Sequence, residues 1–131
     1  MMKDILQEIV DHKKVEVKRF KEALPESDIH LRVEQDMALT QEKRPSMSRA
    51  IMDSDCGIIA EFKRKSPSAG WINRDAKVEE VTNAYQHNGA SALSILTDSD
   101  FFGGSDKFVS EAIASGVTLP VLYKNFVVDE Y

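Results

Sequence analysis

Three ionisable side chains stand where apolar segments of the sequence end: Glu61 and Lys63 at the end of one segment, and Lys124 at the end of another. A lysine ammonium can polarise a carbonyl oxygen and give it a proton. A second lysine nearby lowers the pKa of such a group, whereas a carboxylate opposes that change. Two lysines and one glutamate held together would therefore form a tunable acid–base site.

The segments around these residues have the pattern of alternating strands and helices. Strands are predicted for three short apolar runs, 57–62, 92–96 and 119–123, and helices for the two segments between them, 75–88 and 105–115. Gly89 is placed to end the first helix, and Ser105 to cap the second. This order predicts a parallel βαβαβ sheet buried on both faces. Because α/β proteins bind ligands at the carboxyl ends of parallel strands, Glu61, Lys63 and Lys124 should converge on one rim.

The residues before the first predicted strand have a weaker pattern. Residues 3–24 have the spacing of an amphipathic helix, which Pro25 should end because proline lacks the amide donor. The apolar residues of 26–45 keep no period for long, so no regular element is predicted there. Ser46 or Ser48 could cap a short helix that follows.

Length and composition limit the class of protein. The 131 residues amount to one domain or less, which we divide into an N-terminal helical extension, 1–56, and a βαβαβ part, 57–131. A net charge of −5 and the lack of an apolar run of about 20 residues predict no nucleic acid and no membrane as partner. A single cysteine fits a reducing cytoplasm. No metal-ligand spacing connects the histidines and the cysteine, His12, His30, His87 and Cys56.

A long motif of unusual composition follows the first strand. Glu-x-Lys-x-x-Ser-Pro-Ser lies within IIAEFKRKSPSAGWI at 58–72, and its spacing to GASALSILTDSDFFGGS at 89–105 and LPVLYKNFVVDEY at 119–131 is also distinctive. Together these stretches resemble the indole-3-glycerol phosphate synthase family. The resemblance implies an α/β fold that is the N-terminal portion of a (β/α)8 TIM barrel, strands 1–3, preceded by a helical extension.

The resemblance also implies an activity. Family members convert 1-(2-carboxyphenylamino)-1-deoxyribulose 5-phosphate to indole-3-glycerol phosphate, with loss of CO2 and water, in tryptophan biosynthesis. The implied partner is this small phosphorylated molecule, and no metal or organic cofactor is implied. The function expected from the resemblance is therefore that of a carboxy-lyase.

Roles for individual residues follow from the same resemblance. Lys124 is similar to the acid that protonates the substrate's ketone oxygen. Lys63 is similar to a lysine that pairs with the anthranilate carboxylate or donates a later proton, and Glu61 to the residue that orients Lys63. Substrate contacts are implied for Ser66, Pro67 and Ser68 in the loop, and for Leu96, Phe102 and Phe126 as apolar walls. Asn125 stands where the family commonly has aspartate, and the amide would support the Lys124 ammonium less than a carboxylate.

Each of these residues also has a structural interpretation. Glu61 could form a structural ion pair with a lysine, because buried glutamates are rarely unpaired. The basic residues at 63–65 could be a solvated loop, and Gly103-Gly104 a turn before a helix. The aromatic residues could equally belong to the core, namely Phe101, Phe102 and Phe126.

Only three of eight strands can be placed in a chain of this length, because a (β/α)8 barrel needs about 250 residues. The general-base glutamate and the glycine-rich phosphate site that the family carries on later strands have no counterpart here. Three strands also leave two unpaired edges, which favour self-association. Two hypotheses follow: a synthase whose 131-residue chain is inactive alone, or a non-catalytic barrel fragment acting as an assembly or binding module. An isomerase-type, phosphate-handling barrel would share the fold but not the motif.

Overall fold

The computed structural model describes residues 4–40 and 43–131. The chain forms two compact units, of which one joins the described residues up to Lys43 to the segment Phe126–Tyr131. The other unit is Arg44–Asn125 and contains all the strands found in the described residues. The boundary predicted after residue 56 falls inside this second unit. No helix in the described part of the chain is long and apolar enough to cross a membrane.

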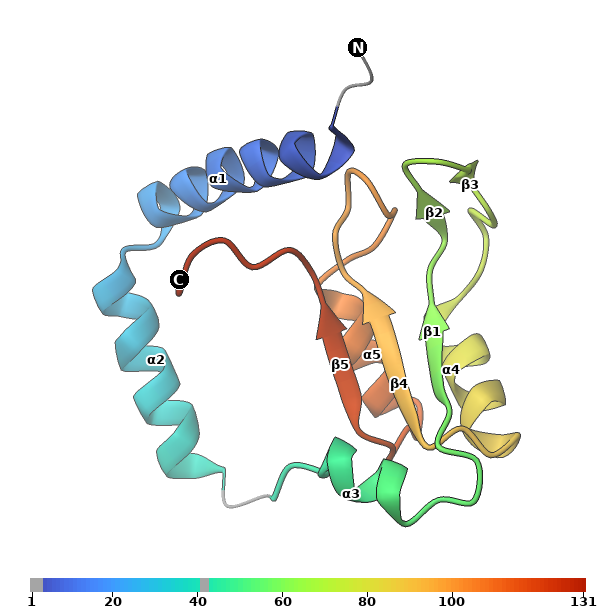
Figure 1. Cartoon of the computed structure of the whole chain (residues 1–131). Helices are drawn as coiled ribbons and strands as arrows, with labels where there is room; N and C mark the ends of the chain where they lie inside the picture. Colours follow the sequence, from blue (N-terminus) through green and yellow to red (C-terminus); the bar gives the residue numbers. More distant parts are fainter. Residues whose placement is uncertain (1–3, 41–42) are drawn as a thin grey trace. The chain divides into compact units, whose positions relative to one another are not determined.

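The first unit begins with the predicted amphipathic helix, α1 (Ile5–Ala23), as Figure 1 shows. Asp4 caps it, since its carboxylate accepts hydrogen bonds from the amides of Leu6 and Gln7 at 3.0 and 3.5 Å. The helix ends immediately before Pro25, as the missing amide donor of proline requires. The helix predicted over 3–24 is therefore confirmed within the described residues, and residue 3 lies outside them.

A second helix, α2 (Glu26–Leu39), occupies the segment for which no regular element was predicted. The omission was wrong because it relied on an apolar stripe, and no residue of α2 is buried. Glu26 and Asp28 in the first turn favour the helix by facing its positive end, and most of the other residues are good helix formers. Propensity and terminal charge, rather than burial, account for α2.

The final segment of the chain contacts α1 through polar groups. The hydroxyl of Tyr131 donates to the carbonyls of Phe20 and Leu24, at 3.0 and 2.6 Å. Both carbonyls lie at the end of α1, and that of Phe20 also accepts from the amide of Leu24 at 2.8 Å. Lys21 also forms an ion pair with Asp129, at 2.9 Å.

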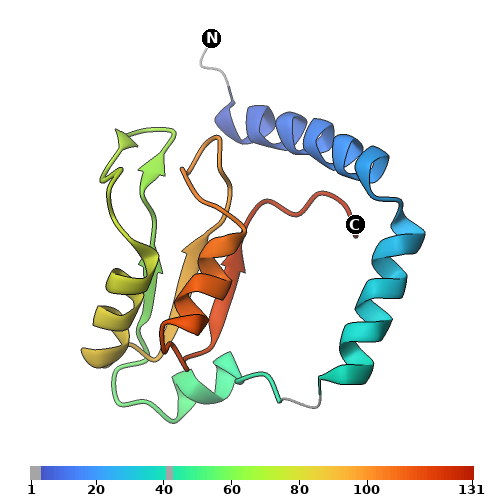
Figure 2. The ribbon, with the colours of Figure 1, turned by 180° about the vertical axis from the view of Figure 1, so that it is seen from behind.

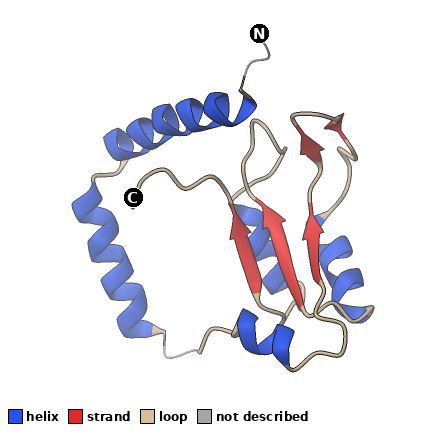
Figure 3. Cartoon of the chain, in the orientation of Figure 1, coloured by secondary structure: helices blue, strands red, loops and turns tan. Residues whose placement is uncertain are grey.

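The second unit is built on a parallel sheet of three strands in the order β1 (Ile59–Phe62), β4 (Ala92–Leu96) and β5 (Val121–Lys124), shown red in Figure 3. The connecting helices are α4 (Val78–His87) and α5 (Lys107–Ala114). The predicted βαβαβ order and parallel pairing are confirmed, and the fold is mixed α/β. Gly89 follows α4 with a φ of 90°, a left-handed value that suits the predicted glycine stop.

Helices α4 and α5 cover one face of the sheet, behind it in Figure 1 and in front of it in Figure 2. The core lies between these helices and the sheet, and its buried residues are Phe62, Val78, Leu93, Ile95, Ala112 and Val117. The prediction that all strands are buried on both faces is right for β4 and wrong for the outer strands. Ile59 and Leu122 are 45% and 46% exposed, because β1 and β5 each have only one neighbouring strand and the helices lie on the opposite face.

Two smaller elements complete this unit. Ser46 caps α3 (Met47–Met52) by accepting from the amide of Arg49, which selects Ser46 over Ser48 as the predicted cap. Figure 1 places α3 beside the amino ends of the strands, away from the rim where the strands finish. The loop after β1 contains an unpredicted hairpin of β2 (Lys65–Ser66) and β3 (Gly70–Trp71). Two residues per strand are too few to give a recognisable alternation.

Candidate functional site

The ends of β1 and β5 bring Glu61 and Lys124 together across the central strand. The ammonium of Lys124 donates to Oε2 of Glu61 at 2.7 Å, although the two residues are 63 positions apart. Register explains the approach: Glu61 pairs with Ser94, and Lys124 pairs with Leu96 two residues further along β4. All four side chains consequently point to the sheet face that α4 and α5 do not cover. The predicted convergence of Glu61 and Lys124 on one rim is present.

Ser94 is the third member of this polar group. Its hydroxyl donates to the same Oε2 of Glu61, at 3.0 Å, from a side chain that is 4% exposed. Glu61 therefore has a rigid partner in the sheet as well as a flexible one at its edge. The sequence pattern did not single out Ser94, although a hydroxyl inside the apolar run of a central strand is the signal that could have found it.

The charge state of Glu61 results from opposing effects. Burial raises the pKa of its carboxyl, but the hydrogen bonds from Lys124 and Ser94 and the charges of Lys124 and Lys63 outweigh burial and lower that pKa. Glu61 is therefore ionised at neutral pH and accepts hydrogen bonds only. An ammonium has three protons, so one donated to Glu61 leaves two for a ligand at the rim.

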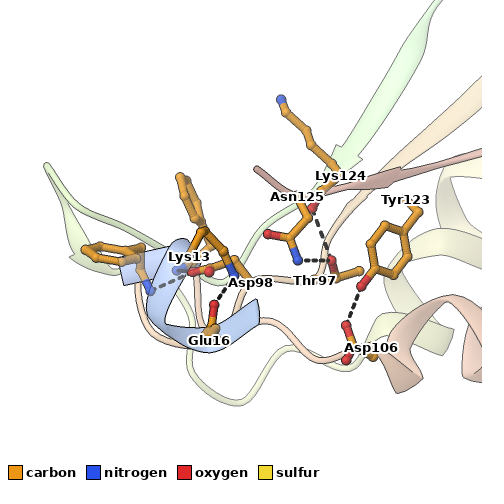
Figure 4. A network of polar contacts seen from close by, with 10 residues as sticks. Lys13, Glu16, Thr97, Asp98, Asp106, Tyr123, Lys124 and Asn125 are labelled. Carbon is orange, nitrogen blue, oxygen red and sulfur yellow. Dashed lines mark hydrogen bonds and ion pairs between the residues drawn. The ribbon is translucent and has the colours of Figure 1, made fainter. Parts of the chain in front are cut away.

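A second set of contacts fixes the end of β5 against the end of β4 (Figure 4). The amide and hydroxyl of Thr97 both donate to the carbonyl of Lys124, at 3.1 and 3.2 Å, and Asn125 donates to the Thr97 hydroxyl at 3.2 Å. The hydroxyl of Tyr123 donates to Asp106, and partial burial together with this hydrogen bond raises the pKa of Tyr123. The side chain of Lys124 extends away from these contacts (Figure 4), so its backbone is held while its ammonium stays at the rim.

The contacts of Asn125 address the expectation that an amide at this position supports the Lys124 ammonium less than a carboxylate would. The carboxylate that Lys124 contacts is Glu61, whereas Asn125 donates to Thr97. Glu61 therefore supplies to the ammonium the charge that the amide of Asn125 cannot.

Lys63 lies one residue beyond β1, where its side chain is exposed. The charge of Lys63 helps to lower the pKa of Glu61, but the ion pair of Glu61 is with Lys124. The predicted orienting of Lys63 by Glu61 therefore stays a prediction. In the hairpin after Lys63, the hydroxyl of Ser66 accepts from the amide of Ala69 at 3.1 Å and lies 3.4 Å from that of Ser68. Ser66 thus shapes the turn, at whose tip Pro67 and Ser68 are exposed.

The apolar walls predicted for the site are only partly assembled. Leu96 is buried on the same sheet face as Glu61 and Lys124. Phe102 lies in the loop between β4 and α5, half-buried, and its amide donates to Oδ2 of Asp98 at 3.3 Å. Phe126 belongs to the other compact unit, so its predicted part in the wall stays a prediction.

Asp98 organises the loop that carries Phe102. Its Oδ2 also accepts from the amide of Phe101 at 2.7 Å, and its carbonyl accepts from the amide of Gly104 at 2.7 Å. The tightness of this turn explains the glycines: a Cβ on Gly104 would lie 2.3 Å from the carbonyl oxygen of Leu96. The sequence alone suggested only a turn at Gly103-Gly104. The structure shows in addition that neither position has room for a side chain.

Comparison with known proteins gives a consistent result. The sequence model of the family described as Indole-3-glycerol phosphate synthase matches residues 6–131. A protein of that name from Bacteroides thetaiotaomicron is 47% identical over 130 residues, which cover 99% of this chain and 48% of the relative. Its namesake from Rhodospirillum rubrum is 41% identical, over 99% of this chain and 49% of the relative. A third, from Prochlorococcus marinus, is 37% identical, over 98% and 42%. The chain spans about half the length of the curated relatives it matches.

Proposed function

The chain belongs to the indole-3-glycerol phosphate synthase family, and we propose that it provides one part of the catalytic rim for indole ring closure. The substrate would be 1-(2-carboxyphenylamino)-1-deoxyribulose 5-phosphate, and the product indole-3-glycerol phosphate. The observation that supports this proposal best is the 2.7 Å contact between Lys124 and Glu61 at the ends of two parallel strands. It places an ammonium with spare protons where α/β proteins bind their ligands.

The proposed chemistry uses Lys124 as the acid. The ring carbon that bears the carboxylate attacks the ketone carbon, and the carbonyl electron pair moves to oxygen, which takes a proton from Lys124. Loss of CO2 returns the electron pair of the broken bond to the ring. The new hydroxyl then leaves as water with a proton from an acid, while the methylene carbon next to the substrate amine gives a proton to a base, which forms the double bond of the indole ring. Lys63 is the candidate donor for this later step or the partner of the substrate carboxylate.

Glu61 has a supporting role in this scheme. Its lowered pKa keeps it anionic, so it attracts the Lys124 ammonium without competing as a proton donor. Ser94 holds the carboxylate from the buried strand, which limits the positions that the ammonium can adopt. The substrate contacts proposed for Ser66, Pro67, Ser68, Leu96, Phe102 and Phe126 would complete the wall around the anthranilate ring.

We further propose that the sheet is the first three strands of a (β/α)8 barrel, and that the helices before it form an N-terminal extension. The half-length match to the relatives supports this proposal. A base for dehydration and an anchor for the substrate phosphate would then come from residues outside this sequence. The isolated chain is accordingly expected to be inactive in the cytoplasm, and its outer strands β1 and β5 offer edges for association.

A chimera tests the proposal directly. Residues 1–131 are fused to the part of the Bacteroides thetaiotaomicron relative beyond its match, and the fusion and the chain alone are introduced into a strain that lacks the synthase. Growth without tryptophan is expected with the chimera and not with the chain alone. Growth with neither would contradict the synthase proposal and favour a non-catalytic assembly module or an isomerase-type barrel. Indole-glycerol fluorescence formed by the purified chain, and lost in Lys124→Ala, would contradict the predicted inactivity.

A further inference from the structure

Arg64, next to Lys63, connects the two loops that carry the candidate substrate contacts. Its Nε and Nη2 donate to the carbonyl of Gly103 at 3.0 and 2.8 Å, and its Nη1 donates to the carbonyl of Arg74 at 3.1 Å. Gly103 lies in the loop after β4, and Arg74 in the loop after β1. One guanidinium therefore fastens both loops through backbone carbonyls, whose positions no side-chain rotation can change.

Aromatic rings enclose the same guanidinium. Its carbon lies 5.0 Å from the centre of the Phe108 ring and 5.6 Å from that of Trp71. Trp71 also lies under two further cations, at 5.5 Å from Lys65 and 4.6 Å from Arg74. Cations over the face of an indole are attracted by its quadrupole, so the hairpin that carries Trp71 is drawn to the basic groups around it.

The loop after β4 packs closely against Trp71 and the basic side chains around it. A Cβ on Gly103 would lie 2.7 Å from Cζ3 of Trp71, so only glycine lets the indole pack against that backbone. Lys65 adds a contact in the same direction, since its ammonium donates to the carbonyl of Asp100 at 2.8 Å. Three independent contacts thus join the hairpin to the loop that holds Phe102: the Arg64 fork, the Trp71–Gly103 packing and the Lys65 hydrogen bond.

We propose that Arg64 is a positioning residue for the proposed ring closure, which clamps the Ser66–Ser68 turn to the loop that carries Phe102. The inference rests on the proposed function of the rim. The side chain is committed to two carbonyls and two aromatic rings, so its role is to hold the substrate loops in register and not to contact the reacting atoms. A lysine cannot replace it, because one ammonium cannot reproduce the planar fork on Gly103 while reaching Arg74.

Trp71 is the sole tryptophan and gives the clamp a spectroscopic signature that does not depend on activity. Arg64→Lys keeps the charge and the fold but should release the hairpin, which raises the acrylamide quenching constant of Trp71 fluorescence. Arg49→Lys is the matched control, because Arg49 is exposed on α3 near the opposite ends of the strands. A quenching constant for Trp71 that is no greater in Arg64→Lys than in Arg49→Lys would overturn the proposed clamp.

Kinetics of the chimera test the positioning role. Arg64→Lys should lower kcat/KM by roughly ten- to hundredfold, because misplacement of substrate contacts by about 1 Å has effects of this size. Arg64→Ala should be partly rescued by millimolar guanidinium ion, which restores the donors without the covalent link. A released hairpin with unchanged kcat/KM would overturn the inference but not the proposed function. An unmodified chimera without turnover would overturn the proposed function, and the positioning role with it, whatever the quenching shows.

Discussion

The ion pair between Glu61 and Lys124 should be measurable as a coupling free energy. Single variants Glu61→Gln and Lys124→Met, and the double variant, remove the charges while retaining much of the side-chain volume. The two side chains are 32% and 49% exposed, so solvent screening reduces the attraction despite the 2.7 Å contact. We expect a coupling of about 0.5–1 kcal/mol at neutral pH, the upper part of the range for partly exposed pairs.

Urea unfolding followed by circular dichroism gives the four free energies of the cycle. The pair Lys77–Glu80 is the internal control, because its side chains are 62% and 68% exposed at 3.3 Å and its coupling should be smaller. Since the pKa of Glu61 is lowered in the folded state, its stabilising contribution is present above the unfolded pKa and is lost as pH falls through the folded pKa. A coupling no larger than that of the control, or one that persists after Glu61 is protonated, would refute the geometry on which the site is built.

Three further perturbations address other contacts. Gly104→Ala should destabilise the second unit by about 1–3 kcal/mol because its Cβ meets backbone at 2.3 Å, whereas Gly70→Ala meets nothing within 4 Å and should cost only its φ strain; urea midpoints that rank these two in reverse would contradict the tight turn. Ser94→Ala removes a donor to Glu61 and should raise the pKa of that carboxyl, which an NMR titration can follow. An unchanged pKa would refute the role given to Ser94. Tyr131→Phe removes two hydrogen bonds to the end of α1, so amide exchange in residues 126–131 should accelerate; unchanged protection would show that the hydroxyl does not hold this segment.

Much of the second unit could be predicted from the sequence because its signals are local and strong. The apolar run at 92–96 is reproduced as β4 without change, since a central strand between two neighbours is buried throughout and needs mostly apolar residues. The first helix was also predictable from its apolar spacing and from Pro25. Helix α2 was missed because propensity without burial leaves no periodic trace, and the β2–β3 hairpin because two-residue strands have no pattern.

The rim was predictable in outline but not in its pairing. Parallel topology is enough to place Glu61 and Lys124 at one end of the sheet, yet only register shows that both face the side away from α4 and α5. Ser94 and Arg64 were missed for different reasons. The contact of Ser94 with Glu61 depends on cross-strand register, and the fork of Arg64 depends on a loop whose conformation is set by Asp98 and two glycines. Such contacts between distant segments have no signature in a single sequence.

The most direct test of the account is turnover by the purified chimera with and without Lys124. Formation of indole-3-glycerol phosphate is followed by its fluorescence for the unmodified chimera, for Lys124→Ala and for Lys77→Ala. Lys77 is the control because it is exposed and lies at the start of α4, after the β2–β3 hairpin. The account predicts that Lys124→Ala abolishes turnover while Lys77→Ala retains it and both variants melt at similar temperatures. Turnover by Lys124→Ala within a few fold of the unmodified chimera would contradict the assignment of Lys124 as the acid.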